Sequence, residues 1–203
     1  ADRMLMEGDP FCLVEGMTIA AMATGATEGF VYIRSEYPES IEAMQAAIVA
    51  SEERGWLGAS VLGTGRAFRL YVRVGAGAYI CGEETALLSS LNGERGQPTA
   101  KPPFPAVSGA FKQPTLLNNV ETVATVPVIV GMGGAAYAGV GTEESTGTKM
   151  FSLSGHVKRP GNYEMPLSAT YRDLIEGKGG GIKDGRQLKC FVPGGSSMPV
   201  CPC

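Results

Sequence analysis

The sequence is poor in the features that mark several large classes of protein. No apolar run in its 203 residues approaches the ~18 residues that a bilayer-spanning helix needs. The opening residues, Ala1–Met6, place no basic region ahead of an apolar segment, so a secretory signal is not recognised. Acidic residues outnumber basic ones by 20 to 17, which argues against a nucleic-acid-binding surface. We therefore expect a soluble or peripheral protein that does not insert directly into a membrane.

Cysteine pairing and metal ligation are also poorly supported. The five cysteines are odd in number and scattered, which argues against a disulfide framework and for a reducing compartment: Cys12, Cys81, Cys190, Cys201 and Cys203. Cys12 and Cys81 have small or apolar neighbours, as buried thiols do. Cys201-Pro-Cys203 has only Cys190 near it in sequence, so we expect no metal site in this chain.

Glycine is abundant instead, with 29 residues, and the most informative glycines lie in the stretch Gly75–Thr85. This stretch joins a predicted strand, 68–74, to a predicted helix, and it carries Tyr79 and the adjacent acids Glu83 and Glu84. Because glycine lacks a Cβ atom, a flat or anionic ligand can touch the backbone, and a helix N-terminus favours negative charge. The same helix end would favour Glu83 and Glu84 as ordinary first-turn acids. The spacing is neither G-x-G-x-x-G nor a P-loop, so a ligand site and a structural turn are both open.

Helices and strands alternate in the first 130 residues. Apolar periodicity and turn residues predict helix, strand, helix, strand and helix at 9–25, 30–34, 38–50, 68–74 and 82–91. Such alternation with short turns predicts an α/β layer with a mainly parallel sheet. Two strands are too few to complete that sheet, and the chain lacks an initiating methionine. We therefore expect an internal piece of a longer protein, with part of the sheet upstream of Ala1.

The segment 95–113 is irregular because proline pairs impose an extended path that no helix or central strand follows. It contains the run Lys101-Pro-Pro-Phe-Pro105. The segment is either a surface crossover or a rigid wall that presents Lys101 and Phe104 over a cleft. In the second case the Phe104 ring would stack on a ligand, and the Lys101 ammonium would meet a phosphate or a carboxylate.

An apolar helix that ends near Val130 is predicted after Asn118 and Asn119. Asn119 is a natural N-cap, and Thr122 follows three residues later. Capping alone would explain these residues. The alternative is that a phosphate also binds at this helix N-terminus, held by backbone amides and by the side chains of Asn118, Asn119 and Thr122.

The pattern changes after residue 130. Residues 131–148 are rich in glycine and are expected to be a linker between one domain, 1–130, and a second, 149–203. In the second domain, short strands and tight turns surround one predicted helix, 170–175, which indicates a small α+β unit of the β-grasp kind. His156 is the only histidine and has no carboxylate or nucleophile motif beside it, so we expect neither a general base nor a catalytic triad.

Four motifs occur in the order and spacing of one family: Gly75–Thr85, Lys101–Pro105, Asn118–Thr122 and Pro193–Ser197. Together they are far more specific than any one of them. Over essentially its whole length the chain resembles the NADH-binding flavoprotein subunit of respiratory complex I. The family that it resembles also includes the diaphorase subunits of NAD-dependent formate dehydrogenases and soluble hydrogenases.

The resemblance implies a Rossmann-like domain, incomplete at its N-terminal side, that holds FMN with NADH over it, followed by a β-grasp domain. It implies FMN contacts from Tyr79, Gly82, Glu83, Glu84, Asn118, Asn119 and Thr122, and NADH contacts from Lys101 and Phe104. Glu84, with Glu83, would tune the flavin by disfavouring its reduced, anionic form. No protein acid or base is implied, because hydride passes from nicotinamide to flavin.

By the same resemblance, the intact parent is an NADH:acceptor oxidoreductase of the NADH:ubiquinone type, in which FMN passes electrons singly to iron–sulfur clusters. An upstream glycine-rich FMN loop, an acidic nicotinamide loop and four cysteine ligands of a [4Fe–4S] cluster lack counterparts in this sequence, so we expect the chain alone to be inactive. The implied partners are a thioredoxin-like [2Fe–2S] subunit and other redox subunits, in the cytoplasm or on the cytoplasmic side of the inner membrane. An NAD-reducing diaphorase and a non-catalytic binding module are the alternatives.

Overall fold

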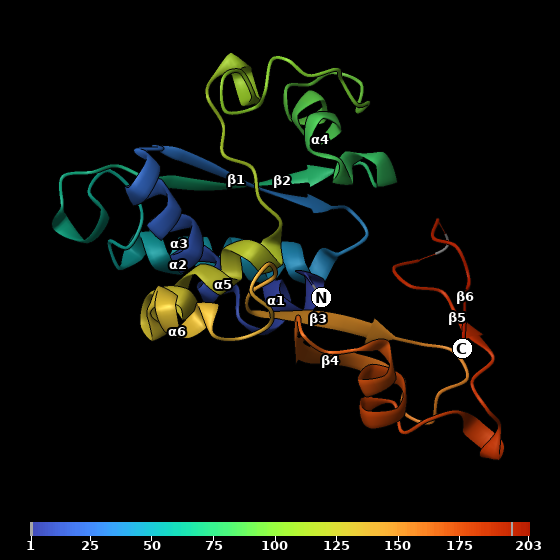
Figure 1. Cartoon of the computed structure of the whole chain (residues 1–203). Coiled ribbons are helices and arrows are strands. Elements are labelled where there is room, and N and C mark those ends of the chain that lie inside the picture. The colour runs from blue at the N-terminus through green and yellow to red at the C-terminus, as the bar shows by residue number, and fades with distance from the viewer. Residues whose placement is uncertain (1, 196) are drawn as a thin grey trace. The chain divides into compact units, whose positions relative to one another are not determined.

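Helices and strands alternate through the first part of the computed structural model, which describes residues 2–195 and 197–203 (Figure 1). The elements in order are α1 (Asp2–Gly8), α2 (Pro10–Thr24), β1 (Glu28–Arg34), α3 (Pro38–Glu53), η1 (Val61–Gly63), β2 (Arg69–Gly75), η2 (Tyr79–Gly82), α4 (Glu84–Leu91), η3 (Ala110–Lys112) and α5 (Val120–Met132). The strands β1 and β2 pair in parallel. The predicted alternation and the parallel pairing are therefore confirmed.

The ends of α2 follow from its sequence. The Asp9 carboxylate accepts a hydrogen bond from the Cys12 N–H at 3.2 Å, which satisfies one of the amide groups that the first turn leaves free. Pro10 fits the first turn because its position needs no N–H donor. Gly25 ends the helix in the left-handed region, with φ of 79°, where glycine meets no Cβ penalty. The same logic starts α3 at Pro38.

The pleat of β1 separates two environments. Val31 and Ile33 are buried in a core formed with α1, α2 and α3, which includes Leu13, Met44 and Phe68. The helix α4 lies on the opposite face of the sheet (Figure 1). On that face the Tyr32 hydroxyl and the Ser90 hydroxyl are hydrogen bonded at 2.8 Å, which ties β1 to α4.

The helices α2 and α5 approach each other at Gly16. A Cβ atom at this position would overlap the backbone carbonyl oxygen of Val123, and it would lie 3.0 Å from the Cγ1 atom of the Val123 side chain. Only glycine allows two helix backbones to come this close. Because Val123 lies in the first turn of α5, this contact helps to fix where α5 begins.

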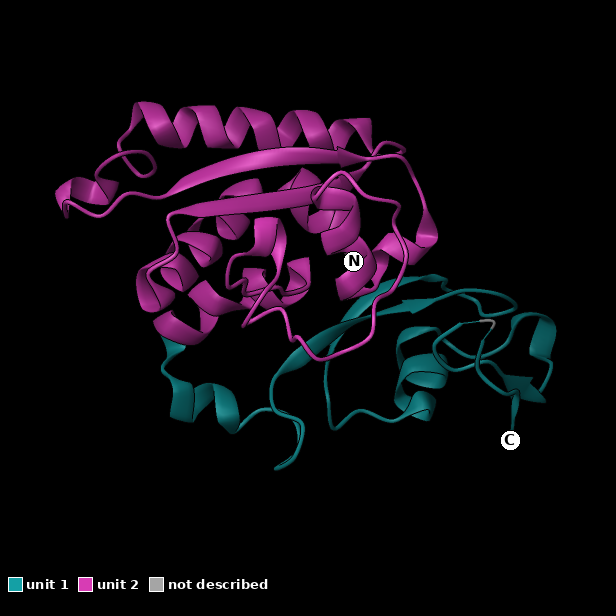
Figure 2. Cartoon of the chain, turned by 90° about the horizontal axis from the view of Figure 1, so that it is seen from above, with its two compact units in different colours: residues 1, 132–203 teal, residues 2–131 magenta. Residues whose placement is uncertain are grey.

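Residues 132–203 form a separate compact unit, shown in teal in Figure 2. Its elements are α6 (Gly134–Ala138), β3 (Thr148–Leu153), β4 (Gly161–Pro166), the π-helix η4 (Asp173–Lys178), η5 (Lys183–Gly185), β5 (Cys190–Phe191) and β6 (Cys201–Pro202). The strands form two antiparallel pairs, β3 with β4 and β5 with β6. No helix in the described residues is both long and apolar enough to cross a bilayer.

Several local predictions for this unit need correction. The stretch 131–148, expected to be a linker, contains the short helix α6. The predicted helix 170–175 begins with a short turn and continues as η4 to Lys178, and the predicted strand 188–192 is reduced to β5. The terminal Cys201-Pro-Cys203 contributes β6, which pairs with β5. Ser196, in the Pro193–Ser197 motif, lies outside the described residues.

Candidate functional site

The first site segment follows β2, as the sequence predicts. A Cβ atom at Gly75 would lie 2.5 Å from the Tyr32 hydroxyl oxygen, so any larger residue here would force the Tyr32 ring to move. The chain then forms η2, which leaves the Tyr79 side chain 89% exposed. Gly82 is also exposed, and α4 begins two residues later, at Glu84 rather than at the predicted Gly82. The segment therefore presents a tyrosine ring and bare backbone to solvent.

Glu83 caps α4 with its own carboxylate. The Oε2 atom accepts hydrogen bonds from the Thr85 hydroxyl at 2.5 Å and from the N–H groups of Thr85 and Ala86 at 2.9 Å each. The Thr85 hydroxyl and the Ala86 amide hold the pKa of Glu83 below its ordinary value. Glu83 is therefore the N-cap of α4, one position before the first turn in which the sequence placed it, and Glu84 is the first-turn acid.

Glu84 faces the proline-rich segment instead. Its Oε1 atom forms an ion pair with the Lys101 ammonium, although the two residues belong to different motifs. Glu84 is the chief cause of a raised Lys101 pKa, so the ammonium stays charged at neutral pH. The Thr99 N–H adds a hydrogen bond to the Thr85 hydroxyl at 2.9 Å. These contacts hold the segment against the start of α4, while the Phe104 ring remains 57% exposed.

The second site segment is the start of α5. The Asn119 Oδ1 atom accepts a hydrogen bond from the Glu121 N–H at 2.9 Å, which confirms the predicted cap. The Asn119 Nδ2 atom donates to the Asp2 carboxylate at 2.8 Å, so both ends of this amide are engaged. Asn118 and Thr122 are exposed beside it. This helix N-terminus therefore offers two polar side chains and a positive dipole end to a ligand.

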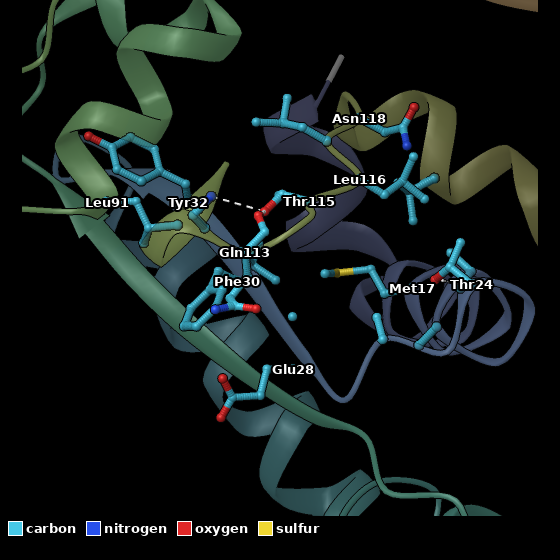
Figure 3. A pocket seen from close by; sticks show the side chains of 18 of the residues that line it. Met17, Thr24, Glu28, Phe30, Tyr32, Leu91, Gln113, Thr115, Leu116 and Asn118 are labelled. Carbon is cyan, nitrogen blue, oxygen red and sulfur yellow. Dashed lines mark hydrogen bonds between the residues drawn. The ribbon is translucent and has the colours of Figure 1, made fainter. Parts of the chain in front are cut away.

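A cavity of about 500 Å³ borders both α4 and the segment that leads into α5 (Figure 3). Its lining is mostly apolar, with Met17, Phe30, Leu91 and Phe111 among its residues, and Asn118 lies at its border. Ligand pockets commonly combine such an apolar lining with a few polar groups. Glu83, Glu84 and Lys101 do not line this cavity.

Sequence reasoning missed the aromatic residues of β1. Phe30 and Tyr32 were interpreted only as parts of a buried strand, yet both line the cavity. The Phe30 ring stacks on Tyr71 of β2 at 5.5 Å and meets Phe111 edge-on at 5.6 Å between ring centroids. Burial raises the pKa of Tyr32, which keeps its hydroxyl protonated for the bond to Ser90. The alternate spacing of the two aromatic residues was the available signal, because residues i and i+2 share one face of a strand.

The cysteines of the first unit have structural surroundings. Cys81 is buried, and the Cys12 thiol donates to the Ala124 carbonyl oxygen at 3.1 Å, which joins α2 to α5. Burial raises the pKa of Cys12, so it remains a thiol. Within the described residues, no three His, Cys, Asp or Glu side chains gather in a way that could hold a metal ion.

Comparison with known proteins gives two family matches and a set of longer relatives. The family model described as the Nuo51 FMN-binding domain matches residues 1–128, and the SLBB domain model matches residues 150–200. An NADH-quinone oxidoreductase subunit of Rhizobium meliloti (strain 1021) is 50% identical over 201 residues, which are 99% of this chain and 48% of that protein. The chain thus spans about half the length of the curated relatives it matches.

Other relatives come from hydrogenases. The NADP-reducing hydrogenase subunit HndC of Solidesulfovibrio fructosivorans is 46% identical over 97% of this chain and 40% of that protein. Among solved structures, a chain of an NAD+-reducing [NiFe]-hydrogenase in the air-oxidized state is similar with a TM-score of 0.84 and 37% identity. This similarity covers 100% of the present chain and 33% of the hydrogenase chain.

Proposed function

The chain belongs to the family of the Nuo51 FMN-binding domain, and from that premise we propose that it forms part of the flavin and NADH site of an NADH dehydrogenase flavoprotein subunit. The observation that carries the proposal is the ion pair between Glu84 and Lys101. It brings the predicted flavin segment and the predicted NADH segment into contact, with the exposed rings of Tyr79 and Phe104 in the same two segments. Two exposed rings and a lysine ammonium in these segments suit a flat, phosphate-bearing ligand.

The donor set at the start of α5 fits the phosphate end of FMN. A phosphate at this N-terminus would meet the positive dipole end of a 13-residue helix, together with the side chains of Asn118 and Thr122. We infer that Asn119 acts mainly by holding the helix start, because its amide is already engaged with Glu121 and Asp2. Tyr79 and Gly82 are exposed. The Tyr79 side chain and the Gly82 backbone would both contact the flavin ring.

When bound, FMN supplies the chemistry, which is acceptance of hydride from NADH and release of single electrons to iron–sulfur clusters. The protein's own residues bind and orient. Lys101 would meet a phosphate of NADH and Phe104 would stack on its adenine. Glu84 would hold Lys101 in place before NADH arrives and would place negative charge near the flavin, disfavouring its reduced, anionic form. Glu83 supports this arrangement by capping α4.

The remaining parts of the proposal concern the whole protein. We propose that residues 1–130 form a Rossmann-like flavin domain, that 131–148 connect it to a β-grasp domain at 149–203, and that the complete subunit also carries a [4Fe–4S] cluster. Its partners would be a thioredoxin-like [2Fe–2S] subunit and further redox subunits, in the cytoplasm or at the cytoplasmic side of the inner membrane. The relatives named as subunits of NADH-quinone oxidoreductase support this assembly.

A diaphorase role that reduces NAD is the second candidate. It is favoured by the similarity to HndC and to the NAD+-reducing hydrogenase chain. Their names describe reduction of NADP or NAD+, which is the reverse of NADH oxidation. The flavin and nucleotide contacts would be the same in both cases. The donor subunits would decide the direction, because hydride transfer between nicotinamide and flavin needs no acid or base from the protein.

The proposal is tested by replacing the matched region of the Rhizobium meliloti relative with this chain and purifying the resulting chimera under reducing conditions. We expect FMN to bind with micromolar or tighter affinity, measured by quenching of flavin fluorescence, and NADH to reduce ferricyanide. Asn118→Asp should weaken FMN binding, because it places a negative charge beside the phosphate. Glu53→Gln, on the exposed end of α3, is the matched control that changes one charge away from the site.

Two results would contradict parts of the proposal, and a third is expected. A folded chimera that binds no FMN contradicts both redox functions and leaves a non-catalytic binding module. FMN binding that Asn118→Asp leaves unchanged contradicts the phosphate site at α5. Activity in the chimera together with no activity in the 203-residue chain alone is the expected outcome, because the chain spans about half of its relatives' length.

A further inference from the structure

Arg34, the last residue of β1, connects the end of that strand to the turn that follows β2. Its Nη2 atom donates to the Gly77 carbonyl oxygen at 3.1 Å and to the Glu36 Oε1 atom at 2.5 Å. Its Nε atom donates to the Glu36 Oε2 atom at 3.2 Å. A guanidinium can bond several acceptors at once because its five N–H groups are fixed in one planar fork. Arg34 and Glu36 thus form a clamp on this turn, the loop clamp.

Gly77 allows the loop clamp to close on the backbone. Its φ of 85° lies in the left-handed region that favours glycine. A Cβ atom at this position would lie 2.8 Å from the Glu36 Oε2 atom, so the carboxylate rests against the bare Cα atom. The hydrogen bonds from Arg34 lower the pKa of Glu36, which keeps this carboxylate charged at neutral pH. Gly77 is therefore held at its carbonyl oxygen by Arg34 and contacted at its Cα atom by Glu36.

The turn that the loop clamp holds leads into the exposed tyrosine of the candidate site. Within the described residues, the bond from Arg34 to Gly77 is the hydrogen bond that ties residues 76–79 to a segment distant in sequence. Tyr79 follows two residues after Gly77, and its side chain is 89% exposed. Cys81, two residues further on, is buried. The loop clamp and Cys81 thus fix the backbone on either side of Tyr79.

The exposure of the loop clamp argues against a large contribution to the stability of the whole chain. The Arg34 and Glu36 side chains are 37% and 48% exposed, and such ion pairs add little to the free energy of unfolding. The same bonds can still restrict a local turn. A turn that is ordered before its ligand arrives loses less conformational entropy when the ligand binds, which strengthens binding.

We propose that Arg34 and Glu36 are positioning residues of the flavin and NADH site, which hold the Gly77 carbonyl and thereby place Tyr79 before a ligand binds. Their location supports this role, because Arg34 pairs with Gly75 at the carboxyl ends of β1 and β2, and parallel sheets bind ligands outside these ends. Arg34 acts through the turn and not by touching the ligand. The inference rests on the proposed function, since it requires that Tyr79 contacts the flavin.

The chimera with the Rhizobium meliloti relative tests this role through its Kd for FMN. Arg34→Met keeps a long side chain but removes its donors, and the Kd should rise about tenfold as pre-organisation is lost. Arg34→Lys keeps the charge without the planar fork and should restore part of the affinity. The urea midpoint should hardly move in either variant. Arg172→Met, which breaks the exposed ion pair with Glu176 in the second unit, is the matched control and should leave the Kd unchanged.

Hydrogen exchange of the same chimera without FMN tests the turn itself. The Cys81 N–H donates to the Ala78 carbonyl oxygen at 3.2 Å, and Ala78 directly follows the clamped glycine. In Arg34→Met, the peptide that spans residues 76–83 should therefore exchange about threefold faster or more, as followed by mass spectrometry. A peptide that spans residues 120–130 of α5 is the internal control.

A double variant shows whether the two residues act as a unit. Glu36→Gln should also weaken FMN binding, and Arg34→Met combined with Glu36→Gln should bind FMN about as weakly as Arg34→Met alone. Additive effects contradict the loop clamp, and so does a fall in the urea midpoint that accounts for the weaker binding. Weaker binding in Arg34→Met with unchanged exchange and a normal Kd in Glu36→Gln would make Arg34 a direct ligand contact and overturn the proposal.

Failure of this inference and failure of the flavin proposal give different results. An unchanged chimera that folds but binds no FMN contradicts the flavin proposal, and with it the positioning role. FMN binding that both Arg34→Met and Glu36→Gln leave unaltered contradicts the loop clamp alone. If Arg34→Met does not fold, the Kd and the exchange of Glu36→Gln decide the matter, because this variant keeps the shape of the side chain and removes only its charge.

Discussion

Replacing Gly16 by alanine has two opposing effects on the stability of the chain. Glycine inside a helix is about 1 kcal/mol less favourable than alanine, so propensity alone predicts that Gly16→Ala stabilises α2. The structure predicts the reverse, because the new Cβ atom would overlap the Val123 carbonyl oxygen of α5. Overpacking of this kind costs about 1–3 kcal/mol. The obstacle is a backbone atom that cannot rotate away, so we take the upper value and expect a net loss of about 2 kcal/mol.

Urea unfolding followed by tryptophan fluorescence measures this loss. Trp56 is the only tryptophan of the chain, and its ring lies 6.4 Å from the Phe11 ring of α2, so its emission reports on the unit that contains Gly16. With a urea m-value of about 2 kcal/mol/M, the expected loss lowers the midpoint by about 1 M. Because Val123 belongs to the first turn of α5, the same change should also weaken FMN binding at Asn118 and Thr122.

Gly8→Ala is the matched control. Gly8 is the last residue of α1, and nothing lies within 4 Å of the Cβ atom that alanine would add there. It should stabilise the chain by about 0.4–1 kcal/mol, as glycine replacement does at unobstructed sites. If Gly16→Ala is as stable as the unchanged chain or more stable, α2 and α5 do not touch at this point and the reasoning is refuted.

Two further predictions concern the charged residues of the site. The lowered pKa of Glu83 means that its stabilising contribution is present above its ordinary value of 4.5 and is lost as pH falls through the folded-state value. Glu83→Gln should therefore flatten the acid side of a plot of urea midpoint against pH, and an unchanged acid slope contradicts the cap. Lys101→Met breaks an ion pair between partly exposed groups, so the unfolding midpoint should hardly move while the Kd for NADH rises in the chimera. The same change at exposed Lys112 should leave the NADH affinity unaltered, and equal effects of the two variants contradict the assigned contact.

Local signals determined most of the elements in the first unit. Asp9, Pro10 and Gly25 delimit α2, and Pro38 begins α3, because each acts on its own backbone or on residues within one turn. Such effects can be read along the chain without knowing the fold. The cap at Asn119 was predictable for the same reason. Predictions weakened in the second unit, where short strands and the π-helix η4 depend on contacts more than on periodicity.

Within the candidate site, sequence reasoning proposed the residues and left their partners undetermined. It could not indicate that the Asn119 amide donates to Asp2, which lies 117 residues away, or that Glu84 pairs with Lys101. It left Glu83 open as a first-turn acid or a ligand contact and could not indicate that the folded chain uses that carboxylate to cap α4. A carboxylate accepts only a few hydrogen bonds, and the folded path of the backbone decides which donors lie within hydrogen-bonding distance of it.

The sequence by itself determined the two ends of α2, the start of α3, the α/β class and the four motifs that indicate the family, because these depend on neighbouring residues and on their order. Only the tertiary structure decided that the aromatic side chains of Phe30 and Tyr32 line a cavity and that the edge of β1 lacks a partner among the described residues. Hydrogen-bonding direction alternates along every strand, but whether an edge is covered depends on segments far away in the chain. That information arises only when the chain is packed in three dimensions.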